Sequence, residues 1–256
     1  MRRVFITGAS SGIGAALARH YAGAGVVLGL AARRSELLSE LAAQLPGELA
    51  VYGLDVGDRD AVARAAADFS ARFGTADLVI ANAGISVGTR GEAIEDVGAL
   101  LKLLEVNVAG LAATLAAFAP AMRTAGRGTL VGIASVAGFR GLPGAGAYSA
   151  SKAAAIAWLE SLRAELHGSG VAVVTICPGF IDTPMTRGNP YRMPFLLPAD
   201  EAARRIARAI AARRRLAVIP WQMALAATLL RALPRPLYDR IVARAPRKRR
   251  TSGERS

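Results

Sequence analysis

The sequence contains one cysteine, Cys177, in 256 residues, so no disulfide can form within the chain. Proteins of oxidising compartments commonly carry paired cysteines, whereas a lone thiol suits a reducing compartment. The first apolar run, Val4-Phe5-Ile6, also starts too early to leave room for a signal peptide before it. We therefore expect a cytoplasmic protein. Cys177 has no basic neighbour close in sequence, and we interpret it as a buried packing residue.

Lysine is scarce as well: the chain has three lysines, Lys102, Lys152 and Lys248, and 29 arginines. The net charge of +13 is uneven: residues 1–199 carry 17 basic and 15 acidic side chains, and residues 200–256 carry 15 and 4. The first part is nearly neutral, so the basic isoelectric point says little about its partners. The final basic run, residues 246–250, has no aromatic side chains on which bases could stack, and we expect no specific nucleic-acid partner.

Short apolar runs rich in Val, Ile and Leu alternate with Ala/Leu/Arg/Glu segments of helical spacing. This alternation predicts an α/β fold with a parallel sheet covered by helices on both faces. The length suits one large domain, and we expect a catalytic domain over residues 1–220 followed by an extension over 221–256. The runs are Val4–Ile6, Val26–Leu30, Leu49–Tyr52, Leu78–Ala81, Thr129–Ile133, Val171–Ile176 and Leu216–Ile219.

A glycine-rich turn, TGASSGIG at residues 7–14, separates the first run from a predicted helix over 15–22. Glycines at such a junction let the backbone turn tightly and approach a pyrophosphate, which the helix N-terminus stabilises. The placement favours a nucleotide site over a plain tight turn.

The second run ends in Ala31-Ala32-Arg33-Arg34, and the nearest acid is Glu36. An NAD site commonly has Asp or Glu about 20 residues beyond the glycines, to bind the ribose 2′-hydroxyl. Here guanidinium groups replace that carboxylate, which suits a 2′-phosphate. The alternative is a pair of solvated arginines that open a helix over 34–44, but the glycine turn favours NADP over NAD.

Polar residues follow three further runs, where open α/β sheets bind ligands. They are Asp55-Val56, Asn82-Ala83-Gly84 and Ser135, although each could equally serve a turn or a helix cap. Asn107 lies inside a predicted helical segment over 96–123. Asparagine has poor helix propensity, and the apolar neighbours of Asn107 favour a buried polar role.

A second glycine-rich loop leads into a predicted helix over 148–167, which opens with Tyr148 and Lys152. Side chains at i and i+4 share one helix face, so this pair can act on one bound molecule. Taken alone, the pair would be an ordinary solvated one. The loop over 180–198 contains four prolines and is predicted to expose Met185, Tyr191, Met193, Phe195 and Leu196, as a lid over an apolar substrate would.

Taken together, these residues resemble the classical short-chain dehydrogenase/reductase family over about residues 3–220. The matching motifs, in this order, are TGASSGIG (7–14), Asp55-Val56, NAG (82–84), NVAG (107–110), Ser135, YSASK (148–152) and PGFIDT (178–183). The resemblance implies a doubly wound, Rossmann-type sheet in a single domain. It also implies hydride transfer between NAD(P) and a carbonyl or alcohol.

The resemblance also implies a role for each catalytic residue. Tyr148 would be the general acid in reduction and the general base in oxidation. Lys152 would hold the nicotinamide ribose and favour the phenolate, which agrees with the effect of a cation on a phenol that titrates near pH 10. Ser135 would donate a hydrogen bond to the substrate oxygen. Asn107 would hold a water in a proton relay that reaches Lys152.

Cofactor contacts are implied in the same way. Gly8, Gly12, Ile13 and Gly14 would cradle the pyrophosphate, Asp55 and Val56 would meet the adenine, and Asn82 would lie beside its ribose. Ile181 and Thr183 would contact the carboxamide, and Arg33 would bind the 2′-phosphate. Some members add a basic residue inside the glycine turn, where this chain has Ser11. Further contacts are expected at Ser10, Ser11, Ala83, Gly84, Tyr148, Lys152, Pro178 and Gly179, and no metal site is predicted.

The extension departs from the resemblance, because members commonly stop soon after the seventh strand. The 15 uncharged residues from Leu216 to Leu230 are interrupted by Pro220 and are too few to span a bilayer. Trp221, Leu225 and Leu229 form an apolar stripe flanked by arginines. It predicts a helix packed on the domain or at a subunit interface, or else one lying on an anionic membrane surface. A short helix is expected over 237–243, and the basic run 246–250 is expected to be disordered.

We therefore expect an NADP-dependent oxidoreductase that acts on an apolar carbonyl or secondary alcohol. The alternative is a nucleotide-binding interaction or membrane-surface protein that uses the fold as a scaffold. A set that combines Asn107, Ser135, Tyr148 and Lys152 argues against the scaffold. The small-residue faces over 107–119 and 150–157 would suit a homodimer or tetramer.

Overall fold

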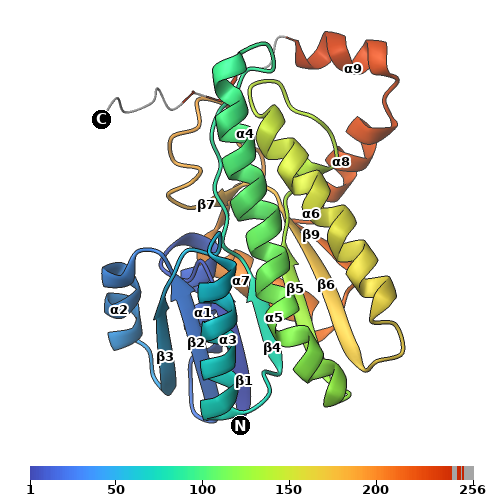
Figure 1. Ribbon diagram of the computed structural model, residues 1–256. Coiled ribbons are helices and arrows are strands. Elements are labelled where there is room, and N and C mark those ends of the chain that lie inside the picture. The colour runs from blue at the N-terminus through green and yellow to red at the C-terminus, as the bar shows by residue number, and fades with distance from the viewer. Residues whose placement is uncertain (244–246, 249, 251–256) are drawn as a thin grey trace.

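The computed structural model describes residues 1–243, 247–248 and 250 of the chain. Seven parallel strands form one sheet in the order β3-β2-β1-β4-β5-β6-β9 (Figure 1). Each predicted apolar run lies in one of these strands, because strands buried on both faces are nearly all apolar. Their bounds are β1 (Arg2–Thr7), β2 (Val26–Ala32), β3 (Glu48–Gly53), β4 (Leu78–Ala81), β5 (Gly128–Ile133), β6 (Val171–Pro178) and β9 (Leu216–Ile219).

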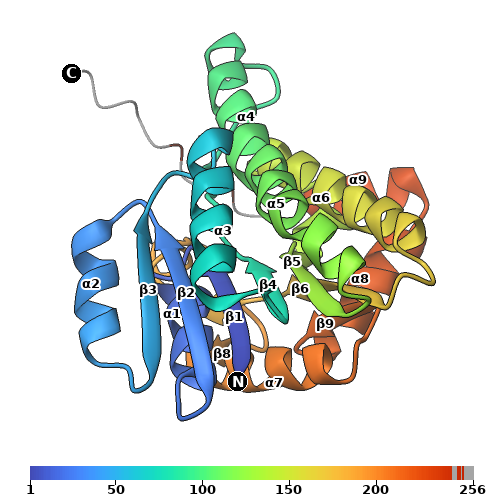
Figure 2. The same cartoon turned by 60° about the horizontal axis from the view of Figure 1, so that its bottom comes forward.

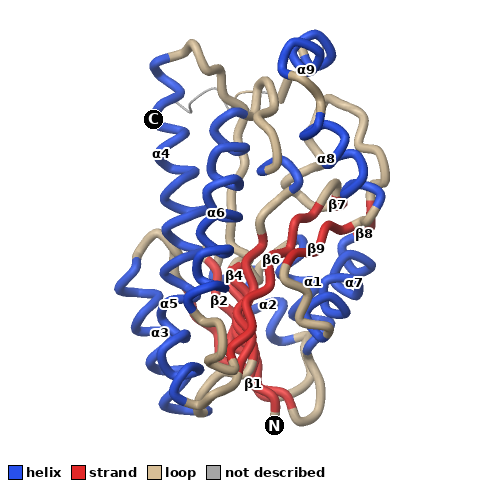
Figure 3. Tube along the Cα trace, turned by 90° about the vertical axis from the view of Figure 1, so that its right-hand side faces the viewer, coloured by secondary structure: helices blue, strands red, loops and turns tan. Residues whose placement is uncertain are grey.

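Helices cover both faces of the sheet, which confirms the doubly wound fold. One face packs against α1 (Gly12–Tyr21), α2 (Ser35–Ala43) and α7 (Ala199–Ala211). The other packs against α3 (Arg59–Phe73), α5 (Gly110–Thr124) and α6 (Gly146–Glu165). Figures 2 and 3 show α7 on the opposite side of the sheet from α3 and α5. The strand order reverses between β1 and β4, and this switch point is where open α/β sheets form their ligand crevice.

Three phenylalanines form the centre of the core on the α3–α5 face. The ring of Phe5 on β1 lies 4.8 Å from that of Phe118 and 5.4 Å from that of Phe69, between ring centroids. Gly29 on the neighbouring strand β2 makes room for them, because a Cβ there would lie 2.4 Å from a ring carbon of Phe5. The sequence of β2 thus admits large side chains from β1 and α3.

A long helical segment runs across this face. It begins with the short 3-10 helix η1 (Ile94–Asp96), continues as α4 (Val97–Leu104), passes through the π-helical turn η2 (Glu105–Ala109), and ends as α5. The 31 residues Ile94–Thr124 contain an 18-residue stretch with a mean hydropathy of 1.6, so the segment is long and apolar enough to cross a membrane by length and composition alone. Leu111, Leu115 and Phe118 of α5 are buried against the sheet and α3, which is typical of a core helix.

Smaller elements complete the fold, with some shifts from the predicted bounds. They are η3 (Val136–Gly138), β7 (Ile181–Asp182), β8 (Leu197–Pro198), α8 (Gln222–Ala232) and α9 (Arg235–Val242). Helix α6 begins at Gly146, two residues before Tyr148, and ends at Glu165. Residues 246 and 249 of the basic run predicted to be disordered lie outside the described residues. The prediction is wrong for Lys248, which donates to Ser86 Oγ at 2.7 Å, and for Arg250, which pairs with Glu95 and Asp96.

Replacing Phe118 by alanine should lower the free energy of unfolding by about 3–5 kcal/mol, because it leaves a cavity between two other aromatic rings. The matched control is Leu101→Ala on α4, where the side chain is 62% exposed. That change should stay within about 0.5 kcal/mol of the wild type. Urea unfolding measures both, and equal losses in the two variants would contradict the assigned core.

Candidate active site

A cleft of about 250 Å³ opens at the carboxyl ends of the strands, over the switch point between β1 and β4. It brings together residues that the sequence places in separate motifs. Asn107 and Gly14 lie beside the cleft but not in its wall. The predicted residues in the wall are Gly8, Ser10, Ser11, Gly12, Ile13, Arg33, Asp55, Val56, Asn82, Ala83, Gly84, Ser135, Tyr148, Lys152, Pro178, Gly179, Ile181 and Thr183.

The glycine turn is packed so tightly that two of its positions exclude any side chain. A Cβ at Gly14 would lie 2.2 Å from the carbonyl oxygen of Gly8, although Gly14 itself has ordinary helical geometry. Gly8 has a φ of +66°, and a Cβ there would lie 2.7 Å from Cα of Ala83. The main chain at Gly14 therefore packs directly against that of Gly8. Because these positions carry no side chains, the main chain of the turn itself forms one wall of the cleft.

Asn82 braces this turn from the end of β4. Its side-chain amide donates to the carbonyl oxygens of Thr7, at 3.0 Å, and Gly8, at 3.2 Å. The buried hydroxyl of Thr7 in turn accepts from the main-chain N–H groups of Asn82 and Ala83. Asn82 also lines the cleft, and its contact with a ribose stays a prediction. The hydrogen bonds of its amide hold the glycine turn against the end of β4.

Two arginines from the end of β2 lie at the opposite wall. Arg33 lies 3.8 Å from the carboxylate of Asp55, between Nη1 and Oδ2. Arg34 reaches back to the glycine turn, where Nη2 donates to the hydroxyls of Ser11 at 2.7 Å and Ser10 at 3.3 Å. The sequence reasoning placed Arg33 in the site and left out Arg34, although the Arg-Arg pair was the available signal.

This end of the cleft fits a phosphorylated nucleotide. Two guanidinium groups and two hydroxyls supply donors for phosphate oxygens, and the glycine turn offers main-chain N–H groups at the N-terminus of α1. Among residues 1–243, 247–248 and 250, no three His, Cys, Asp or Glu side chains cluster as metal ligands would.

Asn107 lies in the π-helical turn η2, and its amide is fully buried. Oδ1 accepts from the N–H of Ile85 at 2.8 Å, and Nδ2 donates to the carbonyl of Ile85 and to Ser151 Oγ, both at 3.0 Å. Both amide hydrogens are therefore used within the protein. Asn107 Oδ1 and Lys152 Nζ would lie 3.1 and 3.5 Å from a Cβ at Gly84, so the two residues proposed for the relay flank one point.

Ser135, Tyr148 and Lys152 converge from the end of β5 and the first turns of α6. Ser135 is buried and accepts from the N–H of Ala137 at 3.2 Å. Lys152 Nζ donates to the carbonyl of Ile133 at 2.9 Å and lies 5.9 Å from the centroid of the Tyr148 ring. Gly138 allows η3 to approach α6, because a Cβ there would lie 2.7 Å from the main-chain carbonyl carbon of Lys152.

Burial sets the ionisation of this group. It raises the pKa of Tyr148 above its ordinary value, and the Ser135 hydroxyl beside the phenol acts in the opposite direction. It lowers the pKa of the Lys152 ammonium to about 8. At neutral pH the site therefore holds a protonated phenol next to a cation. The expected effect of Lys152 on the phenolate is not visible in the pKa of Tyr148, which burial dominates.

Cys177 is buried beside the same group, as the sequence predicted. Burial raises the pKa of its thiol to about 12, against the smaller opposing effect of Lys152. The thiol is therefore protonated at neutral pH and is a packing group, because only the thiolate is a strong nucleophile.

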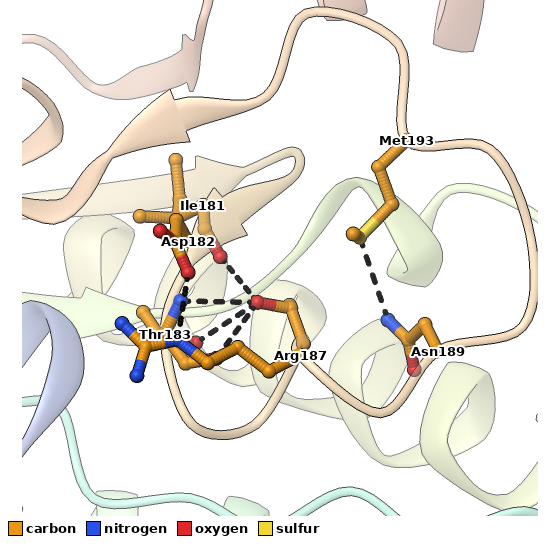
Figure 4. Close-up of polar contacts among 7 residues, drawn as sticks. Ile181, Asp182, Thr183, Arg187, Asn189 and Met193 are labelled. Carbon is orange, nitrogen blue, oxygen red and sulfur yellow. Dashed lines mark hydrogen bonds and ion pairs between the residues drawn. The ribbon is translucent and has the colours of Figure 1, made fainter.

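The loop between β7 and β8 covers one side of the cleft and is held by Thr186. Figure 4 shows polar contacts of this loop around Ile181 and Thr183. Thr186 Oγ1 donates to the carbonyl of Ile181 at 2.6 Å and accepts from the N–H of Thr183 at 3.1 Å. The sequence reasoning did not include Thr186, although this hydroxyl positions Thr183 in the wall of the cleft.

The prediction that this loop exposes all five of its large apolar side chains is wrong for two of them. Met185, Phe195 and Leu196 are exposed, but Tyr191 and Met193 are partly buried. The Tyr191 ring lies 6.2 Å from that of Phe180, between centroids, and this contact covers part of its surface.

Comparison with known proteins places residues 2–192 in the family described as short chain dehydrogenase. An uncharacterised oxidoreductase of Myxococcus xanthus is 40% identical over 243 residues, which cover 93% of this chain and 95% of that protein. A sulfoacetaldehyde reductase of Chromohalobacter salexigens is 37% identical over 186 residues, covering 72% and 74%. The crystal structure of an alcohol dehydrogenase from Thermococcus sibiricus, complexed with 5-hydroxy-NADP, has a TM-score of 0.73 at 29% identity and covers 86% and 96%.

The lowered pKa of Lys152 can be measured directly, because the chain has only three lysines. In NMR spectra of protein made with isotope-labelled lysine, the side-chain resonance of Lys152 should titrate with a pKa of about 8, below the ordinary lysine pKa near 10.4. Lys152→Arg should remove that resonance, and Lys102→Arg should keep it. Titration of every lysine in the ordinary range would contradict the burial of a cation in this site.

Proposed function

The chain belongs to the short-chain dehydrogenase family of oxidoreductases, which act on CH–OH and C=O groups, and we propose that it uses NADP and an apolar substrate. The observation that carries the proposal is the meeting of two features in one cleft. One is the cluster of Arg33, Arg34, Ser10 and Ser11, and the other is the group of Ser135, Tyr148 and Lys152.

The choice of NADP rests on charge at the end of β2. A ribose 2′-phosphate carries negative charge that the 2′-hydroxyl of NAD lacks, so it gains from cations and hydroxyl donors. Arg34 is already held over the glycine turn by Ser11, and Arg33 is held by Asp55.

The chemistry divides between the bound cofactor, which supplies or accepts the hydride, and the side chains of this protein. Tyr148 keeps its proton at neutral pH and gives it to the substrate oxygen as the carbonyl becomes an alcohol. Lys152 stabilises the phenolate that this step leaves behind, because an ammonium beside it lowers the energy of the anion. Ser135 donates to the same oxygen while negative charge develops there. Oxidation uses the same groups in reverse.

An apolar substrate is proposed from the lining of the cleft. Ile85, Pro184 and Met185 lie in its wall together with Val106 and Ile133. The loop that carries Met185 also exposes Phe195 and Leu196 to solvent, which suits a cover that closes over apolar surface. The expected homodimer or tetramer and the cytoplasmic location stay predictions.

Tyr148→Phe should abolish reduction while leaving the dissociation constant of NADPH unchanged within about twofold, because only the phenolic hydroxyl, which carries the transferred proton, is lost. Consumption of NADPH across a panel of apolar ketones, aldehydes and ketoacyl thioesters measures turnover. Retained turnover in the variant would overturn the role of Tyr148. Firm NADPH binding by the wild type without turnover on the whole panel would favour a nucleotide-binding scaffold instead.

Arg34→Ala and Arg33→Ala should each weaken NADPH binding by roughly 10- to 100-fold, since a hydrogen bond to a charged group contributes about 1.5–3 kcal/mol. Binding of NADH should change much less, because it has no 2′-phosphate. Arg123→Ala, at the end of α5 away from the cleft, is the matched control. Calorimetric titration measures all four proteins, and equal losses for both cofactors would discredit the choice of NADP.

A further inference from the structure

Helix α8 packs by one face and leaves the other exposed. Met223 is buried and meets Gly179, where a Cβ would lie 2.7 Å from its Cγ. On the opposite face Trp221, Leu225 and Leu229 are 64%, 59% and 69% exposed. They are spaced four residues apart and so form one stripe. The expected packing of this helix on the domain therefore accounts for Met223 and not for the stripe.

The following helix, α9, repeats this arrangement. Tyr238 is buried, and its hydroxyl donates to the carbonyl of Gly141. Leu237 and Ile241, also four residues apart, are 45% and 52% exposed. We call Trp221, which caps α8, and the helices α8 and α9 together, residues 221–242, the C-terminal arm.

Arg140 fixes the arm to the body of the protein. Its guanidinium donates to the carbonyl oxygens of Leu230, Arg231 and Leu233, which are the unpaired acceptors at the end of α8. The same group stacks on the Tyr238 ring, with Cζ 3.9 Å from the ring centroid. The exposed stripes are thus presented by a helix pair held in place and not by a loose tail.

The charge on the arm is mainly positive. Residues 221–242 contain three basic side chains and a single acidic one, Asp239. Arg231, Arg235 and Arg240 lie on the arm itself and are exposed. Apolar side chains set among exposed arginines are typical of helices that lie in the plane of an anionic membrane, with arginines at the headgroups.

We propose that the C-terminal arm binds the surface of an anionic lipid membrane, with Trp221, Leu225 and Leu229 inserted at the boundary of headgroups and acyl chains. The binding is peripheral, because α8 has 11 residues and spanning a bilayer takes about 20. A second copy of the chain fits this surface less well, since its own arm would bring the same positive charge against it.

The position of the arm agrees with this role. Figures 1 and 3 show α8 and α9 beyond the carboxyl ends of the strands, the end of the sheet at which the cleft opens. Arg140 and Gly141, which hold the arm, directly precede the glycine loop and helix that carry Tyr148. A membrane bound there would lie on the side from which an apolar substrate arrives. The binding itself does not depend on the proposed NADP or substrate.

The test uses the two tryptophans of the chain, Trp158 and Trp221. Trp158 lies partly buried on α6, so full-length protein with Trp158→Phe reports on Trp221 alone. Vesicles of phosphatidylglycerol and phosphatidylcholine in equal amounts should shift its emission to the blue and carry the protein upward in flotation. Vesicles of phosphatidylcholine alone should bind on the order of tenfold less, because the arginines lose their partner.

Leu225→Ser with Leu229→Ser should reduce flotation with the anionic vesicles by roughly tenfold or more. Leu37→Ser, an exposed leucine on α2, is the matched control and should float like the wild type. Unchanged flotation of the double variant, equal binding to both vesicle types, or no shift in Trp221 emission would overturn the proposal. A different result would also overturn it: the wild type is a dimer that binds no vesicles, and the double variant has the mass of a monomer. That result would assign the stripe to contact with a second copy of the chain.

Discussion

The buried amide of Asn107 joins three parts of the chain around the proposed catalytic group of Ser135, Tyr148 and Lys152. It pairs with both main-chain groups of Ile85, after β4, and with Ser151, next to Lys152 on α6. A buried polar group left without partners costs about 1–3 kcal/mol, so these bonds oppose any slippage between the elements. The π-helical turn sets the amide at this junction, and such turns are frequent at functional sites. These bonds fix the segment of Gly84 and Ile85 relative to α6, which carries Tyr148 and Lys152.

The cofactor end of the cleft is organised in a similar way, by polar groups that hold one another before any ligand is bound. Asn82 and Thr7 lock the glycine turn to the end of β4. Ser11 and Asp55 hold Arg34 and Arg33 at the cleft wall. Groups already ordered lose less freedom on binding, so these charges would be available to the 2′-phosphate of the proposed cofactor at a smaller entropic cost. In the proposed function, cofactor selectivity and reaction chemistry depend on separate sets of residues in one cleft.

The sheet and most of the cleft wall could be predicted because buried parallel strands are apolar runs and their carboxyl ends share one edge. Contacts between distant residues could not. Arg34 donates to Ser11, which lies 23 residues earlier in the chain, and no local sequence pattern predicts that contact. The π-helical turn has no composition of its own, and the poor helix propensity of Asn107 was its only local sign. Gly14 belongs to the glycine motif but packs against Gly8, and Tyr191 turned inward because Phe180 offers it a partner.

Hydride transfer is the central claim, and it is tested most directly by following the transferred atom. NADPH carrying deuterium at the transferred position of the nicotinamide would be supplied with an apolar ketone that the protein reduces. Mass spectrometry of the alcohol should find the deuterium on the carbinol carbon, with the hydroxyl proton drawn from Tyr148 and exchangeable with solvent. An alcohol that carries no deuterium at that carbon would contradict the account.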